Sequence, residues 1–326
     1  MLSRVAETIY WLARYVERAE NTARLLRVNG QLVMDTPRGV NPGWEPLIEI
    51  IGLGDSFSDC CREPNERNVV RYLIGGSDIP GSILYSLAAA RESARTVREI
   101  LPRAAWEVLN ELHWYAKDHV QTGVSKKGRD HYLEEIITGS QTLQGVFASV
   151  MYRDDAHRFL RIGRSLERAD MTTRIIDVRS TDLFDEEQIE SRTLDALQWI
   201  SVLKSLSGYQ SYRRVRETRV RRGEVLAYLL QDPAFPRSVA HCLNGVEEAV
   251  GGLGDGQRVL RKLRTVARKT RLLEVEHLSR QDLHIFVDEV QRGVMRVHDE
   301  LARTYFLLQY DTSQVQTQTQ GQVATA

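Results

Sequence analysis

Residues 12–24 read LARYVERAENTAR, and residues 162–174 read IGRSLERADMTTR. The two segments align without a gap. The identical pairs are Arg14 with Arg164, Glu17 with Glu167, Arg18 with Arg168, Ala19 with Ala169, Thr22 with Thr172 and Arg24 with Arg174, while Glu20 pairs with Asp170. A second pair of segments, RYLIGGSDIPGSILYSL (71–87) and AYLLQDPAFPRSVAHCL (227–243), repeats in the same order. Because the offsets, about 150 and 156 residues, are nearly equal, the sequence predicts a duplicated helical unit.

The stretch around the first segment has the apolar pattern of a helix. Its apolar stripe consists of Val5, Ile9, Leu12, Val16, Ala19, Ala23 and Leu26. We expect Ser3 to cap this helix and Gly30, or the stretch 35–43, to end it. The Pro- and Gly-rich piece DTPRGVNPGWEP (35–46) is predicted to be a loop. Pro80 and Pro236, each followed two residues later by serine, are expected in the first turn of a helix, where proline costs no hydrogen bond.

The rest of the chain is also helical in pattern. Further helices are expected near residues 66–75, 80–100, 103–120, 130–152, 155–180, 189–208, 222–231, 236–250, 256–274 and 280–310. No sustained alternation calls for a strand, so the sequence predicts an all-α helical bundle built from two tandem, related halves. We expect a first half over 1–150 and a second half over 151–310, packed together as one domain. The polar, low-complexity residues 311–326 are predicted to be a disordered tail.

Composition limits the function classes. The chain has 326 residues, of which 42% are hydrophobic and 27% charged, an ordinary globular balance. Its formal net charge is zero, which gives no general attraction to nucleic acid or membrane and mildly favours a homo-oligomer or a partner complex. Three cysteines fit no disulfide framework and indicate a reducing compartment. The charged N-terminus does not read as a signal peptide, and no apolar run reaches the roughly 18 residues of a membrane span. We therefore expect a cytoplasmic protein.

A charged face accompanies the repeat. On a helix, Arg14, Glu17, Arg18, Asn21 and Arg24 lie on one arc, with Glu7 beside them. The candidate site, called the Arg/Glu seam below, comprises Glu7, Arg14, Glu17, Arg18, Glu20 and Arg24 with Arg164, Glu167, Arg168, Asp170 and Arg174. The simpler interpretation is a solvated face with ion pairs worth a few tenths of a kcal/mol each.

Two features favour an enclosed seam instead. Leu160 and Met171 interrupt the charged arc of the second segment, and Tyr10 takes the place of Leu160 in the first. The matched arginines also stay arginine, although lysine would serve a solvated face equally, which indicates bidentate pairing. The two segments would then face each other around an ion-pair network or a polar cleft.

Three separated segments resemble the bacterial alpha-E family. They are MLSRVAETIYWLARYVERAENTARLL (1–26), AAARESARTVREILPRAAWEVLN (88–110) and LLQDPAFPRSVAHCL (229–243). The family's glutamate-bearing motif maps best to Glu17 and Glu20. The resemblance covers nearly the whole chain ahead of the polar tail and implies a helical protein without an established activity. It also implies two partners, a circularly permuted ATP-grasp protein and a transglutaminase-like protein, and hence a helper role in peptide or amide-bond metabolism.

Three hypotheses follow. The favoured one is a non-catalytic accessory subunit whose seam binds a small anionic ligand or joins the halves. The second is an enzyme in which glutamates move protons and arginines bind a carboxylate or phosphate, although adjacent arginines lower a glutamate pKa and disfavour a general base. The third is a metal-binding bundle. Glu274–His277 and Asp154–His157 have the required spacing, but a second strict motif is missing and we expect no metal. No phosphate loop with its lysine occurs, so no cofactor is expected.

Two arginine-rich stretches raise the question of nucleic acid. They are RRVRETRVRR (213–222) and RVLRKLRTVARKTR (258–271). Valines and leucines within them fit ordinary amphipathic helices, and acidic residues between Asp182 and Glu190 supply partners within the chain. We therefore expect intramolecular pairing and not a nucleic-acid site.

Overall fold

The computed structural model describes residues 1–37, 42–61, 63–181, 192–216, 219–276 and 278–306. The predicted tail, residues 311–326, lies outside the described residues. Over these ranges the chain is helical without a strand, which confirms the predicted all-α class. The helices of the N-terminal part are α1 (Ser3–Asp35), α2 (Glu45–Ile51), α3 (Gly54–Cys60), α4 (Glu66–Gly75), α5 (Ile83–Thr96), α6 (Arg103–Asp118), α7 (Val120–Val124) and α8 (Arg129–Val150). They are followed by α9 (Asp155–Thr181), α10 (Arg192–Ser205), α11 (Tyr209–Val215), α12 (Arg222–Gln231), α13 (Val239–Gly251), α14 (Gln257–Arg271), α15 (Arg280–Leu301) and a π-helical turn (Ala302–Phe306).

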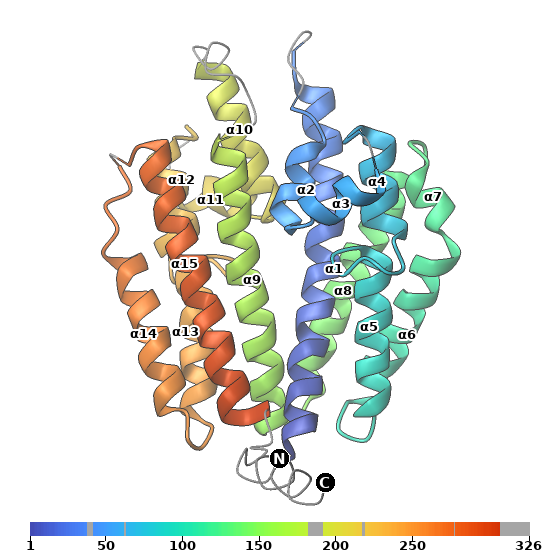
Figure 1. The fold of residues 1–326 in the computed structure, drawn as a ribbon, viewed down its shortest axis with the longest axis vertical. Helices are drawn as coiled ribbons and strands as arrows, with labels where there is room; N and C mark the ends of the chain where they lie inside the picture. The colour runs from blue at the N-terminus through green and yellow to red at the C-terminus, as the bar shows by residue number, and fades with distance from the viewer. Residues whose placement is uncertain (38–41, 62, 182–191, 217–218, 277, 307–326) are drawn as a thin grey trace, which may run out of the picture.

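The two longest helices, α1 and α9, form the centre of the molecule. Figure 1 shows them side by side along the long axis, with the other helices on either side. Helices α5 and α8 pack on α1, whereas α13 and α15 pack on α9. One hydrophobic core runs through both groups of helices. The residues of the Arg/Glu seam therefore lie on the two helices at the centre of the protein. The division into a duplicated pair of halves stays a prediction.

The close approach of α1 and α9 depends on small side chains. A Cβ atom added to Gly163 would collide with the backbone carbonyl of Tyr10 and would lie 3.3 Å from the Cβ of Ala13. Ala13 and Gly163 occupy the same position in the two aligned segments. The two helices thus approach each other closely at Ala13 and Gly163, the smallest pair of aligned residues in the repeat.

Local capping differs from the sequence prediction. Ser82 and Ser238 are the N-caps of α5 and α13, and each hydroxyl accepts a hydrogen bond from a backbone N–H three residues later, at 3.1 and 3.0 Å. Pro80 and Pro236 lie two residues ahead of these caps, so placing them in the first helical turn was wrong. The serine hydroxyl can satisfy a free N–H at the helix start, which proline cannot do.

The predicted limits of other elements also change. Leu2 occupies the cap position of α1, and Ser3 is already helical. Helix α2 begins at Glu45, inside the predicted loop 35–46, because Pro46 fits a first helical turn. Helices α3, α7 and α11, which have seven residues or fewer, were not predicted. Such short elements carry too few residues to display a helical period.

The substitution Gly163→Ala tests the crossing. The added methyl group would push α9 away from the backbone of α1, so we expect the free energy of unfolding to fall by about 1–3 kcal/mol in urea titration. Gly145→Ala on α8 is the matched control, since no atom lies within 4 Å of its added Cβ and alanine favours a helix. An equal loss in both variants would contradict the proposed role of Gly163.

Candidate functional site

Two glutamates each pair with an arginine of the opposite helix across the α1–α9 interface. Glu17 on α1 accepts hydrogen bonds from Nε and Nη2 of Arg168 on α9, at 3.0 and 2.8 Å. Glu167 on α9 accepts from Nε and Nη2 of Arg18 on α1, at 2.6 and 3.1 Å. Both contacts are bidentate, the geometry for which arginine is better suited than lysine. The two aligned segments therefore face each other, and matched residues exchange roles.

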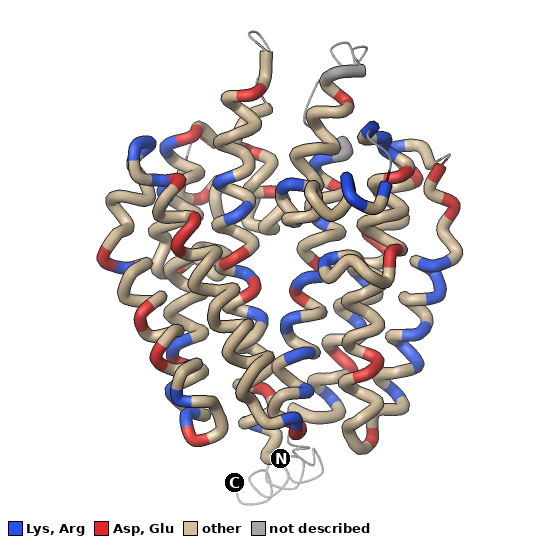
Figure 2. Tube along the Cα trace, turned by 180° about the vertical axis from the view of Figure 1, so that it is seen from behind, with Lys and Arg blue, Asp and Glu red and all other residues tan. Residues whose placement is uncertain are grey.

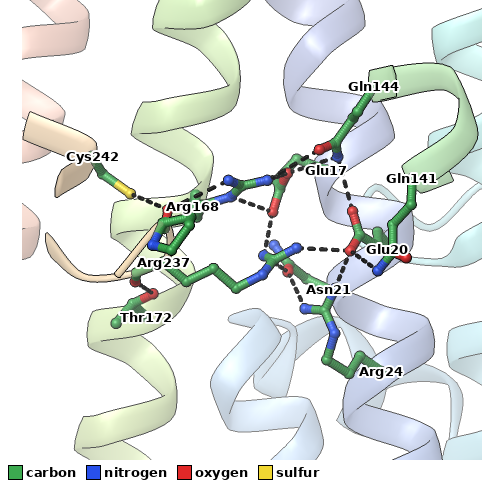
Figure 3. Close-up of polar contacts among 11 residues, drawn as sticks. Glu17, Glu20, Asn21, Arg24, Gln141, Gln144, Arg168, Thr172, Arg237 and Cys242 are labelled. Atoms are coloured by element: carbon green, nitrogen blue, oxygen red, sulfur yellow. Dashed lines mark hydrogen bonds and ion pairs between the residues drawn. The ribbon is translucent and has the colours of Figure 1, made fainter. Parts of the chain in front are cut away.

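Further donors surround the α1 carboxylates. Arg237, from the turn before α13, donates to Glu17 at 2.5 Å and to Glu20 at 2.7 Å (Figure 3). Gln144 on α8 donates to the same two glutamates, at 3.2 and 2.9 Å. Arg24 also pairs with Glu20. Glu17 and Glu20 are completely buried, yet both oxygens of each carboxylate accept hydrogen bonds.

The α9 carboxylate has its own second donor. Arg14 donates to Glu167 at 2.6 Å, and its Nη1 donates to the hydroxyl of Tyr10 at 3.0 Å. That hydroxyl also bonds Nδ1 of His298 on α15, at 2.8 Å. Glu167 is 3% exposed, and both of its oxygens are occupied. We call all these linked side chains the buried network; its members are Tyr10, Arg14, Glu17, Arg18, Glu20, Asn21, Arg24, Gln144, Glu167, Arg168, Arg237 and His298.

Matched residues also make matched backbone contacts. Arg18 donates to the carbonyl of Pro80 at 3.3 Å, and Arg168 donates to the carbonyl of Pro236 at 3.4 Å. The hydroxyls of Thr22 and Thr172 donate to the carbonyls of the residues after those two prolines, at 3.1 and 2.8 Å. Each segment of the first repeated pair therefore holds a segment of the second pair in the same way.

The network fixes the glutamates in their ionised form. Burial alone would raise the pKa of Glu17, but the charges of Arg168 and Arg237 outweigh it and hold the pKa well below its usual range. Burial also opposes ionisation of Glu167, and Arg14 and Arg18 again prevail and lower its pKa to about 2. A carboxylate in this state is a poor general base, because it takes up a proton only in strong acid. The geometry thus supports arginine-fixed anions rather than proton transfer.

Three residues of the predicted seam lie at or beyond its edge. Glu7 is exposed and has no hydrogen bond or ion pair within the described part of the chain. Asp170 pairs with Arg174 one turn along α9, at 3.0 Å, outside the central exchange. Burial raises the pKa of Asp170, against the effect of Arg174. Glu7 was included because its angle around the helix matches that of the other charged residues. That angle does not show whether a partner helix lies beside Glu7.

Arg164 was predicted to join the seam, but it has no hydrogen bond or ion pair with any residue that the structure describes. It lines a cavity of about 530 Å³ beside the buried network. Its counterpart in the other segment, Arg14, bonds a glutamate. The equivalent acceptor for Arg164 would be Glu17, which Arg168, Arg237 and Gln144 already occupy.

Sequence reasoning missed Arg237 and Gln144. Arg237 stands at the position aligned with Gly81, between the matched prolines and serines. This glycine-to-arginine difference was a usable signal, because it places a cation inside one of the two aligned segments, 227–243, at a position where the other has none. Gln144 and His298 offered no such signal, since isolated polar residues occur on many helices.

The metal hypothesis has no support from a ligand cluster in the described ranges, where no three His, Cys, Asp or Glu side chains gather. Asp154 accepts from the backbone N–H of His157 at 3.2 Å, and the ring of His157 contacts Arg153. A neighbouring guanidinium disfavours a cation at that ring. Of the pair Glu274–His277, the histidine lies outside the described residues.

The arginine-rich stretches differ from one another. Residues 258–271 lie on α14 and bury Val259, Leu260, Leu263 and Val266, as an amphipathic helix should. Figure 2 shows basic positions along this helix at the outer edge of the molecule. Three of its basic residues form ion pairs: Arg264 with Glu247 and Lys269 with Glu289 at 2.7 Å each, and Lys262 with Glu300 at 3.2 Å. In contrast, residues 213–222 do not form one helix, since α11 ends at Val215 and that valine is exposed. The acidic residues expected to pair with them, between Asp182 and Glu190, lie outside the described residues.

Within the described ranges, no helix has both the length and the apolar character needed to cross a membrane.

The substitution Glu167→Gln tests the electrostatic role. Because the folded-state pKa lies below the unfolded one, the carboxylate stabilises the fold above about pH 4.5, and this stabilisation is lost as the pH falls toward about 2. At pH 7 we expect the variant to lose about 3–5 kcal/mol of unfolding free energy, since two arginines lose their counter-ion. The difference from the wild type should shrink between pH 4.5 and 2. Glu107→Gln, in an exposed pair with Arg103, should change stability by less than about 0.5 kcal/mol.

The substitution Arg168→Lys tests the bidentate geometry. Lysine keeps the charge but cannot donate two parallel hydrogen bonds to Glu17, so we expect a loss of about 1–3 kcal/mol in denaturant unfolding. Arg264→Lys, in the exposed pair with Glu247, is the control and should have little effect. If Arg168→Lys were as stable as the wild type, the charge alone would suffice.

Comparison with known proteins agrees with this architecture. Residues 1–306 match the family Alpha-E, described as a predicted alpha-helical domain with a conserved ER motif. Two Glu-Arg pairs of the chain, Glu17–Arg18 and Glu167–Arg168, form the centre of the buried network. No solved structure matches the chain significantly.

Curated relatives include uncharacterized proteins of Mycobacterium bovis and of two strains of Mycobacterium tuberculosis. Each is 24% identical over 321 residues, an alignment that covers 89% of this chain and 35% of the relative. The chain thus spans about a third of the length of these relatives. The match over residues 1–306 shows that the chain belongs to the Alpha-E family.

Proposed function

We propose that this chain is a non-catalytic accessory module that binds a small anionic ligand and works beside an ATP-grasp-type partner in peptide or amide-bond metabolism. One observation carries the non-catalytic part. The central carboxylates, those of Glu17, Glu20 and Glu167, are buried and have both oxygens occupied by arginine or glutamine donors. A substrate would have to displace several charge-assisted hydrogen bonds to reach them.

Three arguments support a partner. The resemblance to alpha-E proteins implies an ATP-grasp protein and, as a second partner, a transglutaminase-like protein. The curated relatives contain about twice as much further sequence as the part that matches this chain. A helical region joined to a longer polypeptide fits a module that supports a reaction performed elsewhere. A zero net charge is also compatible with association, including a homo-oligomer.

Co-purification tests this proposal. The chain is expressed with a tagged ATP-grasp protein from the same genome, and ADP formation by that partner is measured with and without it. We expect a stable complex and a changed rate of ADP formation. No association together with an unchanged rate would overturn the partnership.

The enzyme alternative makes a different prediction for Glu17→Gln. If Glu17 were an acid or base, the variant would stay folded and lose turnover. The accessory proposal expects a lower melting temperature, because Arg168 and Arg237 lose a buried counter-ion. Circular dichroism melting of the variant, alone and in the complex, separates the two.

A further inference from the structure

A basic cavity lies beside the buried network. It has a volume of about 530 Å³ and is bounded by the end of α8, the first turns of α9 and the end of α13. Four arginines line it, Arg153, Arg158, Arg161 and Arg164, together with His157 and a single acidic residue, Glu248. Its volume is within the range of small-molecule sites, about 300–1,000 Å³.

One of these arginines, Arg164, lacks a counter-ion among the described residues. Arg164 has neither a hydrogen bond nor an ion pair to any described residue, whereas the other arginines of the Arg/Glu seam each have a carboxylate partner. Burial and the nearby charge of Arg168 lower the pKa of Arg164. Arg164 is partly buried, and a partly buried cation without a counter-ion is less favourable than a paired one, so an anion in the cavity would stabilise it.

Two of the other arginines, Arg161 and Arg158, are held in ways that leave donors for a ligand. Arg161 bonds Glu248 at 2.8 Å, but Glu248 is 72% exposed and lies at the mouth of the cavity. Arg158 pairs with Asp155 at 3.1 Å, and Gly252 makes room for it, since a Cβ there would meet its guanidinium. Exposed pairs of this kind are worth little, so exchanging one for a ligand costs little.

Part of the wall behind the charges is apolar. Phe147, Leu160 and Ala249 line the cavity with the arginines. A bare inorganic ion would leave this surface unused. An organic molecule with one anionic group would place that group against the guanidinium groups and its body against the apolar wall.

We propose that this cavity binds a small organic anion through Arg164 and Arg161, with a phosphate or carboxylate group as the recognised moiety. Both groups present the paired oxygens that a guanidinium binds bidentately. The inference gives a site to the ligand-binding part of the proposed function and rests on it, but it does not depend on the ATP-grasp partner.

Isothermal titration calorimetry with the full chain tests the site, with phenyl phosphate, benzoate, inorganic phosphate and acetate as the probes. We expect saturable binding of phenyl phosphate or benzoate, and weaker binding of the matching small ion. Binding of phenyl phosphate alone identifies a phosphate site, and binding of benzoate alone identifies a carboxylate site. No saturable binding of any probe up to about 10 mM would overturn the proposal.

Two variants and a control locate the binding. Arg164→Gln and Arg161→Gln should each weaken the bound probe by about tenfold or more. Arg264→Gln removes the same charge from a similar exposed pair, Arg264–Glu247, on the other side of α13, and should leave affinity within about twofold. Equal weakening in all three variants would indicate unspecific attraction and overturn the site.

Folding controls keep the result interpretable. Arg164→Gln removes no hydrogen bond or ion pair with a described residue, so its melting temperature should change little. If it did fall, Arg161→Gln, whose partner is exposed, would decide the question by its affinity alone. Probe binding that persists when co-purification with an ATP-grasp protein fails would retain this site and reject the partnership.

Discussion

The reciprocal pairing of Glu17 with Arg168 and of Glu167 with Arg18 is the constraint on which the rest of the structure depends. These charges lie where α1 and α9 cross at Gly163, and the crossing brings the two backbones close enough for both pairs to form. Buried ions are expensive unless their partners are in place. A slip of one turn along either helix would leave a carboxylate and an arginine unpaired. The pairing therefore sets the register of the central helices, and α5, α8, α13 and α15 pack around a pair whose register is already set.

The two sides of this arrangement differ in where the second arginine comes from. Glu167 takes its second arginine, Arg14, from the opposite central helix. Glu17 takes its second arginine, Arg237, from the turn before α13, where the aligned position of the other segment is Gly81. Arg237 thus replaces Arg164 as a partner and leaves it facing the cavity. A single difference between two similar segments is enough to give the two sides of the molecule unlike surfaces.

This arrangement separates stability from binding. The Glu-Arg pairs, which are the most recognisable feature of the chain, lie in a closed network with low glutamate pKa values. They join the two central helices, around which the other helices pack. The proposed ligand would instead meet the arginines around the cavity, of which only Arg164 belongs to the Arg/Glu seam. The family motif and the proposed ligand site would then use different arginines, those proposed to bind the ligand, Arg161 and Arg164, lying on α9 alone.

The sequence by itself determined the helical class, most of the long helices and the facing of two charged segments. The spacing of apolar residues and the retention of arginine between the two aligned segments are local properties. Both can be read directly from a single sequence. Leu160 and Met171, buried as their interruption of the charged arc predicted, signalled an enclosed face. Only the tertiary structure decided which arginine meets which carboxylate, that Glu7 stays exposed, and that Arg164 lines a cavity. Which residues form an ion pair depends on how helices distant in the sequence pack, and on which of several side chains occupies the space between them. Neither can be read from a local sequence pattern.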